Sequence, residues 1–343
     1  MTDHSPRAQP HAPTHALPRV LPLATASSSG SVDTWCVDLH FQGHPNAVAA
    51  YLVADGDELL LIETGPGSTL GALEAGVRAA GFALDQLTGV VVTHIHLDHA
   101  GGAGAVLARA PRARFYVHPR GARHMIDPSK LVASATRIYG ADMDRLWGAF
   151  EPVPAERVTV LEDGDVLRCG RRTFTALHTP GHAVHHLVLH EAARGDVYAG
   201  DVAGVRIGPV RMVIPPTPPP DIDPPAWRAS AARIRALAPQ RLLLTHFGAF
   251  DDAAWHLDDC LTRLYAWTGY VEGRLDAAGG VDAATPALLA DVGAALEAHA
   301  RREVAAAGAD ADAAASSEVA MPMGTALPGI VRWLQVRDRA PAA

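Results

Sequence analysis

The chain has 343 residues, a formal net charge of −8 and a sequence pI near 6.1. This length is enough for one large domain or for a domain with an appended part. The acidic balance argues against nucleic acid as a partner, because proteins that bind it present a broad cationic surface. No apolar run approaches the roughly 20 residues needed to cross a bilayer, so we expect no membrane partner either.

The three cysteines, Cys36, Cys169 and Cys260, are odd in number and lie far apart in the sequence. This pattern favours reduced thiols, and therefore a cytoplasmic location, over a disulfide framework. The apolar stretch of residues 16–26 is short and interrupted by Pro18 and Pro22, so we do not expect a signal peptide. The sequence does not indicate an oligomeric state.

Residues 1–30 are rich in Pro, Ala and Ser without a sustained period, and we expect a flexible tail there. The pattern then becomes regular, with a hairpin and alternating helices and strands. In chain order, we predict strands at 48–53 and 59–62, a helix at 69–80, a strand at 89–92, a helix at 100–108, a strand at 114–117 and short helices within 119–150.

The second half repeats the alternation and then changes character. We predict strands at 158–161, 173–177, 187–190 and 197–199, a helix at 225–237 and a strand at 241–244. Beyond residue 250 the apolar residues follow helical spacing at 256–275, 286–306 and 330–336, whereas 307–317 is rich in Ala, Asp and Gly and is interpreted as a mobile linker. The sequence therefore indicates an α/β domain at 31–250 and a helical appendage at 251–343.

Three imidazoles and a carboxylate occur within residues 93–99, Thr-His-Ile-His-Leu-Asp-His, directly after the apolar run at 89–92. A strand that ends here lets alternate residues His94 and His96 face one point, while Asp98 and His99 can face a second. Imidazole and carboxylate are the usual ligands of zinc, iron and manganese. The segment therefore predicts a metal site, and a solvated His-rich turn is the alternative.

Three later residues stand in similar positions after predicted strands. His182 follows the tight turn Thr-Pro-Gly, and Asp201 and His246 each follow an apolar run. Because a centre with two metal ions needs more than four ligands, these three are the best candidates to complete it. Their strand-end positions allow them to converge.

With these residues in place, the chain resembles the metallo-β-lactamase-fold hydrolases, the superfamily that includes glyoxalase II, lactonases and ribonuclease Z. His94, His96, Asp98 and His99 match its His-x-His-x-Asp-His motif, and His182, Asp201 and His246 match its later ligands in order. The resemblance covers about residues 30–250. It implies an α/β fold in which two sheets pack face to face between outer helices, an αββα sandwich, here followed by the helical appendage.

The resemblance also implies a role for each ligand. His94, His96 and His182 would hold the first metal, Asp98, His99 and His246 the second, and Asp201 would bridge both. One departure is visible, because Glu63 stands where such proteins usually carry an aspartate that orients a ligand histidine. The longer side chain makes its reach a question, and a surface carboxylate at a turn is the alternative, so Glu63 is not counted among the ligands.

A pair of metal ions implies hydrolysis by a metal-bridging hydroxide, with Asp98 as the catalytic group that orients it and passes on a proton. We expect two divalent ions, zinc by default with iron or manganese as alternatives, and a small ester, thioester or lactone as substrate. The alternative activity is that of a sulfur dioxygenase with one iron on the same fold. A non-catalytic scaffold is disfavoured because every ligand position is filled.

Segments outside the core are expected to shape the substrate pocket. The candidates are residues 131–147, the proline-rich stretch 214–224 and the terminal helices. The prolines predict a stiff rim, with a plain linker as the alternative. Tyr139, Met143 and Trp147 could form an apolar wall, but their helical spacing favours a role in the core.

Overall fold

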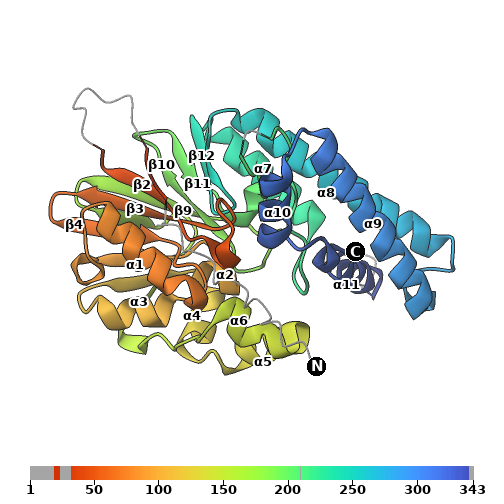
Figure 1. The fold of residues 1–343 in the computed structure, drawn as a ribbon, viewed down its shortest axis with the longest axis horizontal. Coiled ribbons are helices and arrows are strands. Elements are labelled where there is room, and N and C mark those ends of the chain that lie inside the picture. The colour runs from red at the N-terminus through yellow and green to blue at the C-terminus, as the bar shows by residue number, and fades with distance from the viewer. Residues whose placement is uncertain (1–18, 24–31, 209, 340–343) are drawn as a thin grey trace, which may run out of the picture.

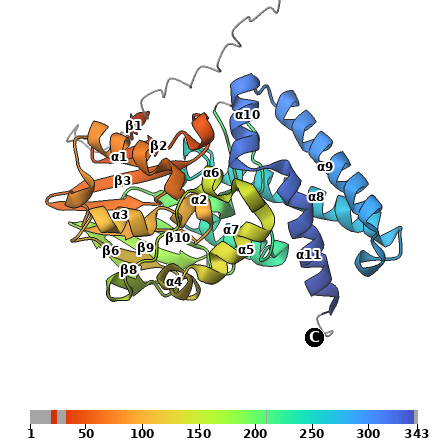
Figure 2. The ribbon, with the colours of Figure 1, turned by 60° about the horizontal axis from the view of Figure 1, so that its bottom comes forward.

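The protein is described here from a computed structural model, which covers residues 19–23, 32–208 and 210–339 (Figure 1). Two β-sheets lie face to face, and helices cover the outer face of each sheet. This arrangement is the αββα sandwich that the sequence predicts. The C-terminal helices extend the molecule on one side, as Figure 2 also shows.

The first sheet has the strand order β1-β2-β3-β4-β5-β6-β7. Strands β4 to β7 run parallel to one another, whereas β3 and β4 form the predicted antiparallel hairpin. The strands are β1 (Val20–Pro22), β2 (Thr34–Asp38), β3 (Ala49–Asp55), β4 (Glu58–Ile62), β5 (Gly89–Val91), β6 (Arg114–Val117) and β7 (Val158–Val160).

The second sheet has the order β13-β12-β11-β10-β9-β8. Its strands are β8 (Val166–Cys169), β9 (Arg172–His178), β10 (Leu187–Glu191), β11 (Asp196–Tyr198), β12 (Arg241–Leu244) and β13 (Gly248–Phe250). Strand β10 is antiparallel to both β9 and β11, and β11 is parallel to β12. Strands β9, β11 and β12 therefore all run in one direction and end at the same edge of the sheet.

Helices α1 (Leu70–Ala79) and α3 (Ala103–Arg109) cover the first sheet, and α7 (Pro224–Ala236) and α8 (Ala253–Asp276) cover the second. Near the first sheet lie α2, α4, α5 and α6, at Leu97–Ala100, Pro119–Ile126, Ser129–Tyr139 and Met143–Trp147. The remaining helices are α9 (Pro286–Ala306), α10 (Ala311–Ala320) and α11 (Ala326–Arg339). Within the described ranges, no helix is long and apolar enough to cross a bilayer.

Alternation along the strands divides the core into layers. On β3, Tyr51 faces the second sheet, where its ring lies 5.4 Å from that of Tyr198, and its neighbour Leu52 packs toward the outer helices. The outer face of the second sheet packs against Trp227 of α7 and Leu264 of α8. Burial on both faces explains why these short strands are almost continuously apolar.

Two sequence-based expectations differ from the structure. Within the predicted tail, Val20–Pro22 form β1 against β2, while residues 1–18 and 24–30 lie outside the described residues. The predicted linker at 307–317 is largely helical, because α10 begins at Ala311 and Asp310 caps it by accepting a hydrogen bond from the Ala313 amide. Ser316 also donates to the Pro45 carbonyl over 2.7 Å. The interpretation of this segment as a mobile linker was therefore wrong.

Candidate metal centre

The site lies where strands of both sheets end. His94 and His96 follow β5 of the first sheet, and the first turn of α2 presents Asp98 and His99. His182, Asp201 and His246 follow β9, β11 and β12, the three strands of the second sheet that share one direction. Backbone hydrogen bonds join the two sheets here, from the Leu187 amide to the Thr93 carbonyl and from the Ala49 amide to the Thr245 carbonyl, each 2.8 Å long.

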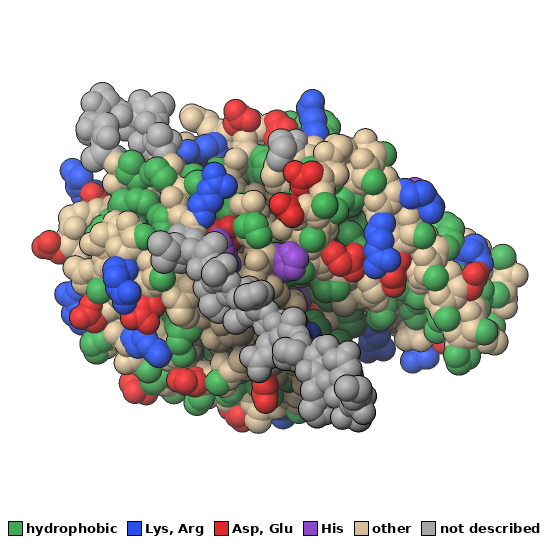
Figure 3. Space-filling model, in the orientation of Figure 1, with side chains coloured by type: hydrophobic (Ala, Val, Ile, Leu, Met, Phe, Trp, Pro, Cys, Tyr) green, Lys and Arg blue, Asp and Glu red, His purple; other side chains and the backbone are tan. Residues whose placement is uncertain are grey.

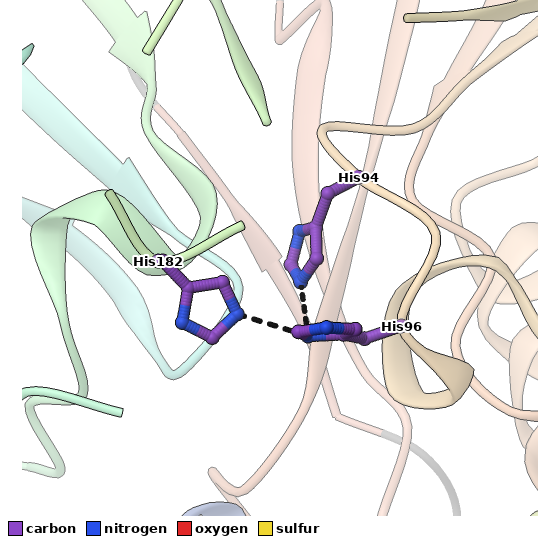
Figure 4. A group of neighbouring side chains, drawn as sticks. All are labelled: His94, His96 and His182. Atoms are coloured by element: carbon purple, nitrogen blue, oxygen red, sulfur yellow. Dashed lines mark hydrogen bonds between the residues drawn. The ribbon is translucent and has the colours of Figure 1, made fainter. Parts of the chain in front are cut away.

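Three imidazoles meet on one side of the site, as Figure 4 shows. The Nδ1 atom of His96 lies 3.0 Å from Nε2 of His94 and 2.9 Å from Nε2 of His182. In a tetrahedral zinc site with bonds of about 2.0–2.1 Å, ligand nitrogens are separated by about 3.3 Å. The three nitrogens are thus already close to the positions that one shared ion requires.

The other side of the site combines carboxylates with two imidazoles. Nε2 of His246 lies 3.2 Å from Oδ2 of Asp98, and Nε2 of His99 lies 3.6 Å from the same oxygen. Asp201 reaches both sides, because its Oδ1 is 3.1 Å from Nε2 of His99 while its Oδ2 is 3.4 Å from Nε2 of His182. The structure therefore brings together all seven predicted ligands, in three overlapping groups whose ligand atoms lie within 4.8 Å of one another.

Hydrogen bonds on the far side of the rings aim the histidines inward. Nδ1 of His182 bonds the Pro216 carbonyl over 2.8 Å, and Nδ1 of His246 bonds the Ala47 carbonyl over 2.7 Å. Each bond fixes the ring orientation and leaves Nε2 with its lone pair toward the centre, as is usual for metal-binding histidines. These two hydrogen bonds therefore favour the tautomer with the proton on Nδ1, in which Nε2 is free to bind an ion.

The chemistry of the site fits a metal. Nε2 of His99, Nε2 of His246 and Oδ1 of Asp201 are buried and have no hydrogen-bond partner. A buried polar atom without a partner costs about 1–3 kcal/mol, so three such atoms around one point need an explanation. A divalent ion held by these atoms would satisfy all of them.

Electrostatics separates the two sides. Burial lowers the pKa of His96 to about 3, assisted by the neighbouring imidazole of His182. Burial opposes ionisation of Asp98, but the imidazoles of His99 and His246 outweigh it and lower its pKa to about 2. At neutral pH the first side therefore offers neutral imidazoles and the second side an ionised Asp98. Burial opposes protonation of His99 and His246, but the carboxylates of Asp201 and Asp98 outweigh it and raise the pKa of both imidazoles, so an ion bound there would displace protons.

Glu63 reaches the site in spite of the question raised by its length. Its side chain is only 1% exposed, and its Oε1 lies 3.2 Å from Nδ1 of His99 and 3.3 Å from Oγ1 of Thr245. It also accepts hydrogen bonds from the amide and hydroxyl groups of Thr93. The backbone at Glu63 has φ 65°, a left-handed conformation that is uncommon for a residue other than glycine. The longer side chain therefore still brings its carboxylate to His99 and Thr93.

His186 also supports the site, and the sequence analysis does not single it out. It is fully buried, and its Nε2 accepts a hydrogen bond of 3.1 Å from the Asp201 amide. Its Nδ1 lies 2.9 Å from Oγ1 of Thr179. His186 thus positions the backbone of Asp201, and no spacing pattern in the sequence indicates this.

The site opens into a cavity of about 220 Å³. Four of the candidate ligands form its floor, namely His96, Asp98, His182 and Asp201, and its walls are mainly apolar. The walls come from α5 and α6, from the proline-rich stretch through Pro216 and Pro218, and from α10 through Val319 and Ala320. Tyr139 and Trp147 also line the cavity, so their side chains do not serve the core alone, as their helical spacing had favoured. The position of the prolines agrees with the prediction that they form a rim.

Comparison with known proteins gives the family. Residues 44–246 match the model of the Metallo-beta-lactamase superfamily, and the chain belongs to this superfamily. Among curated relatives, it is 27% identical over 177 residues to the human acyl-coenzyme A thioesterase MBLAC2, covering 46% of this chain and 58% of the relative. It is 29% identical over 120 residues to the hydroxyacylglutathione hydrolase of Aeromonas salmonicida, covering 35% of each chain. The matches thus span only part of these relatives.

Solved structures show the same fold. A metallo-beta-lactamase family protein from Thermus thermophilus matches with a TM-score of 0.55 and 22% identity, covering 67% of this chain and 78% of that one. An archaeal superfamily protein from Sulfolobus tokodaii matches with a TM-score of 0.52 and 25% identity, covering 63% and 80%. The sequence-based assignment of fold and family is therefore confirmed.

Proposed function

We propose that this protein is a metal-dependent hydrolase of a small ester, thioester or lactone, with a thioester as the foremost candidate. The observation that carries the proposal is the convergence of seven candidate ligand side chains, four of which form the floor of an apolar cavity. His94, His96 and His182 would hold one divalent ion, and Asp98, His99 and His246 a second, with Asp201 between them. Zinc is the expected metal, and iron and manganese suit the same donors.

Bound metal would supply a Lewis acid and a water molecule of lowered pKa. The chain contributes the remaining functions. The carboxylate of Asp98 lines the cavity and is ionised at neutral pH, so it can orient a water molecule and accept its proton. The apolar walls exclude bulk water and hold the acyl part of the substrate beside the ligands. Water then adds to the acyl carbon, the bond to sulfur or oxygen breaks, and the proton passes to the leaving group.

The relatives support this choice of chemistry, because the two curated names quoted above both denote hydrolysis of a thioester. We propose a small molecule as the partner, since the candidate ligands open into a cavity of about 220 Å³. On the face drawn in Figure 3, acidic and basic side chains are interspersed. The three cysteines are buried and free, in keeping with the proposed cytoplasmic location.

The test is metal analysis of the purified protein, followed by assays of the zinc-, iron- and manganese-loaded forms with ester, thioester and lactone substrates. We expect about two ions per chain and hydrolysis of a thioester. One iron per chain with oxygen uptake on a persulfide would favour the dioxygenase alternative. Full metal loading without turnover of any member of the panel would contradict the proposed activity.

A further inference from the structure

A second and larger cavity opens beside the apolar one. Its volume is about 770 Å³, and it shares His96, Leu131 and Ser134 with the first cavity. Its own walls come from α4, from the start of α5, and from Val184 and Pro220 of the second half of the chain. His96, a candidate metal ligand, therefore stands where the two cavities meet.

The lining of this second cavity is cationic. Arg120, Arg123 and Lys130 line it, and Lys130 is the only lysine in the sequence. Among the described residues, no carboxylate lies within ion-pair distance of any of the three, although most other arginines in the fold are paired. The one carboxylate in the lining is Asp221, so the cavity retains a positive surplus.

This local positive charge contrasts with the chain as a whole, which carries a net charge of −8. Unpaired cations that share a concave surface repel one another, and an anionic ligand offsets that repulsion. Guanidinium and ammonium groups bind phosphate through charge-assisted hydrogen bonds. The imidazoles of His124 and His185 add further polar contacts in the same lining.

The two cavities differ in the part of a substrate that each can accept. A phosphate group placed against the apolar walls of the first cavity would lose its hydration without gaining partners. An alkyl chain placed among the cations of the second would gain little. A substrate that spans both must therefore be apolar at one end and anionic at the other, with its reactive carbonyl near His96.

We propose that the substrate is an acyl thioester whose thiol half carries phosphate groups, with the acyl chain in the apolar cavity and the phosphate-bearing half against Arg120, Arg123 and Lys130. This inference rests on the proposed hydrolase function and names its substrate class. The cationic side chains bind the leaving group and take no part in the bond-breaking step. They are specificity-determining residues, and we expect their replacement to change KM and to leave kcat unaltered.

The experiment compares two thioesters with the same acyl group. Octanoyl-coenzyme A carries phosphates, and S-octanoyl-N-acetylcysteamine does not. In the triple variant Arg120→Ala, Arg123→Ala and Lys130→Ala, we expect KM for octanoyl-coenzyme A to rise at least about tenfold, because the variant loses the charge-assisted contacts to the phosphates. KM for the truncated thioester, and kcat for both substrates, should stay within about twofold of the wild-type values, a range that corresponds to less than about 0.5 kcal/mol.

A matched triple variant separates local contact from overall charge. Arg112, Arg137 and Arg168 are exposed and line neither cavity, so their replacement by alanine removes the same charge elsewhere. We expect this control to bind octanoyl-coenzyme A as the wild type does. Equal losses in the two triple variants, or equal losses for the two thioesters, would overturn the inference.

A binding measurement keeps the inference testable if neither thioester is hydrolysed, an outcome that counts against the proposed function instead. Calorimetry with coenzyme A alone should show binding to the wild-type protein that weakens at least about tenfold in the cavity variant. Pantetheine, which has no phosphate, should bind both proteins equally weakly. Absence of coenzyme A binding to the wild type, or turnover of a lysophospholipid in place of either thioester, would overturn the proposal.

Discussion

Asp201 is the residue on which both halves of the candidate centre depend. Its two oxygens face different groups of imidazoles, and its amide is held by His186. We expect Asp201→Ala to lower bound metal well below the wild-type content and to abolish hydrolysis, measured by plasma emission and by thioester assay. Replacing the exposed Asp163 by alanine is the control. Unchanged metal content in the Asp201 variant would contradict its bridging role.

Glu63 allows a test of side-chain reach. Aspartate tolerates a left-handed backbone better than glutamate does, so Glu63→Asp should not strain the chain at φ 65°. It would instead pull the carboxylate away from His99 and Thr93. We expect metal affinity to fall by about 10–100-fold, measured by competition with a chromophoric chelator. Glu58→Asp, an exposed change on the preceding strand β4, should leave the affinity unaltered.

His256 makes stability depend on pH. It is fully buried against the Ala203 carbonyl, and burial lowers its pKa from 6.5 to about 4. As the pH falls, this imidazole is therefore protonated in the unfolded chain before it is protonated in the folded one. The contribution of His256 to the free energy of unfolding is complete above pH 6.5 and is lost progressively down to about pH 4. The loss is roughly 3 kcal/mol. Urea unfolding at several pH values should show that the free energy of unfolding depends less on pH in His256→Gln than in the wild type. His299→Gln, at an exposed position, should keep the wild-type dependence.

The sequence indicated the residues that converge at the candidate centre better than it indicated the residues that support them. His94, His96, Asp98 and His99 form a dense local pattern, and the other three ligands follow recognisable strands. The contributions of Glu63 and His186 depend on a left-handed backbone and on a contact between segments far apart in the chain. Such features arise from tertiary packing and leave no periodic signal.

At the scale of elements, α5 lines the cavity that is proposed to hold the acyl group. Ala135 is buried and lines the apolar cavity, whereas Ala133 is exposed on the same helix. We expect Ala135→Phe to fill part of the cavity and to lower kcat/KM for octanoyl thioesters by about tenfold or more, while acetyl thioesters are affected little. A chain-length series measures this selectivity. Ala133→Phe should keep the wild-type series, and the same loss in both variants would indicate a general disturbance of the helix.

Elements with a strong period were predicted well, and the hairpin of β3 and β4 and the helices α8 and α9 lie close to their expected bounds. The predictions failed where the signal was short or ambiguous. Strand β1 has only three residues and gains its stability from pairing with β2. The alanine-rich α10 resembles a linker in composition, and its packing beside Pro45 and the cavity could not be inferred locally.

At the scale of the whole molecule, bound metal would cross-link the two sheets, because its candidate ligands follow strands of both sheets. Removing metal leaves several buried polar atoms without partners. We expect chelation to lower the melting temperature by several degrees, since metal present at 100 times its Kd stabilises the folded state by about 2.7 kcal/mol. Scanning calorimetry with and without chelator measures the shift. Asp201→Ala should be nearly insensitive to chelator, and an equal response would assign the effect to other sites.

The wall that α10 gives to the apolar cavity lies far along the chain from every candidate ligand. Reactivity and discrimination are therefore encoded in different stretches of the polypeptide. If the proposed function holds, substitutions in Ala311–Ala320 would change which acyl groups are admitted and leave the candidate ligands untouched. This separation gives the scaffold a route to new substrates that leaves its chemistry intact.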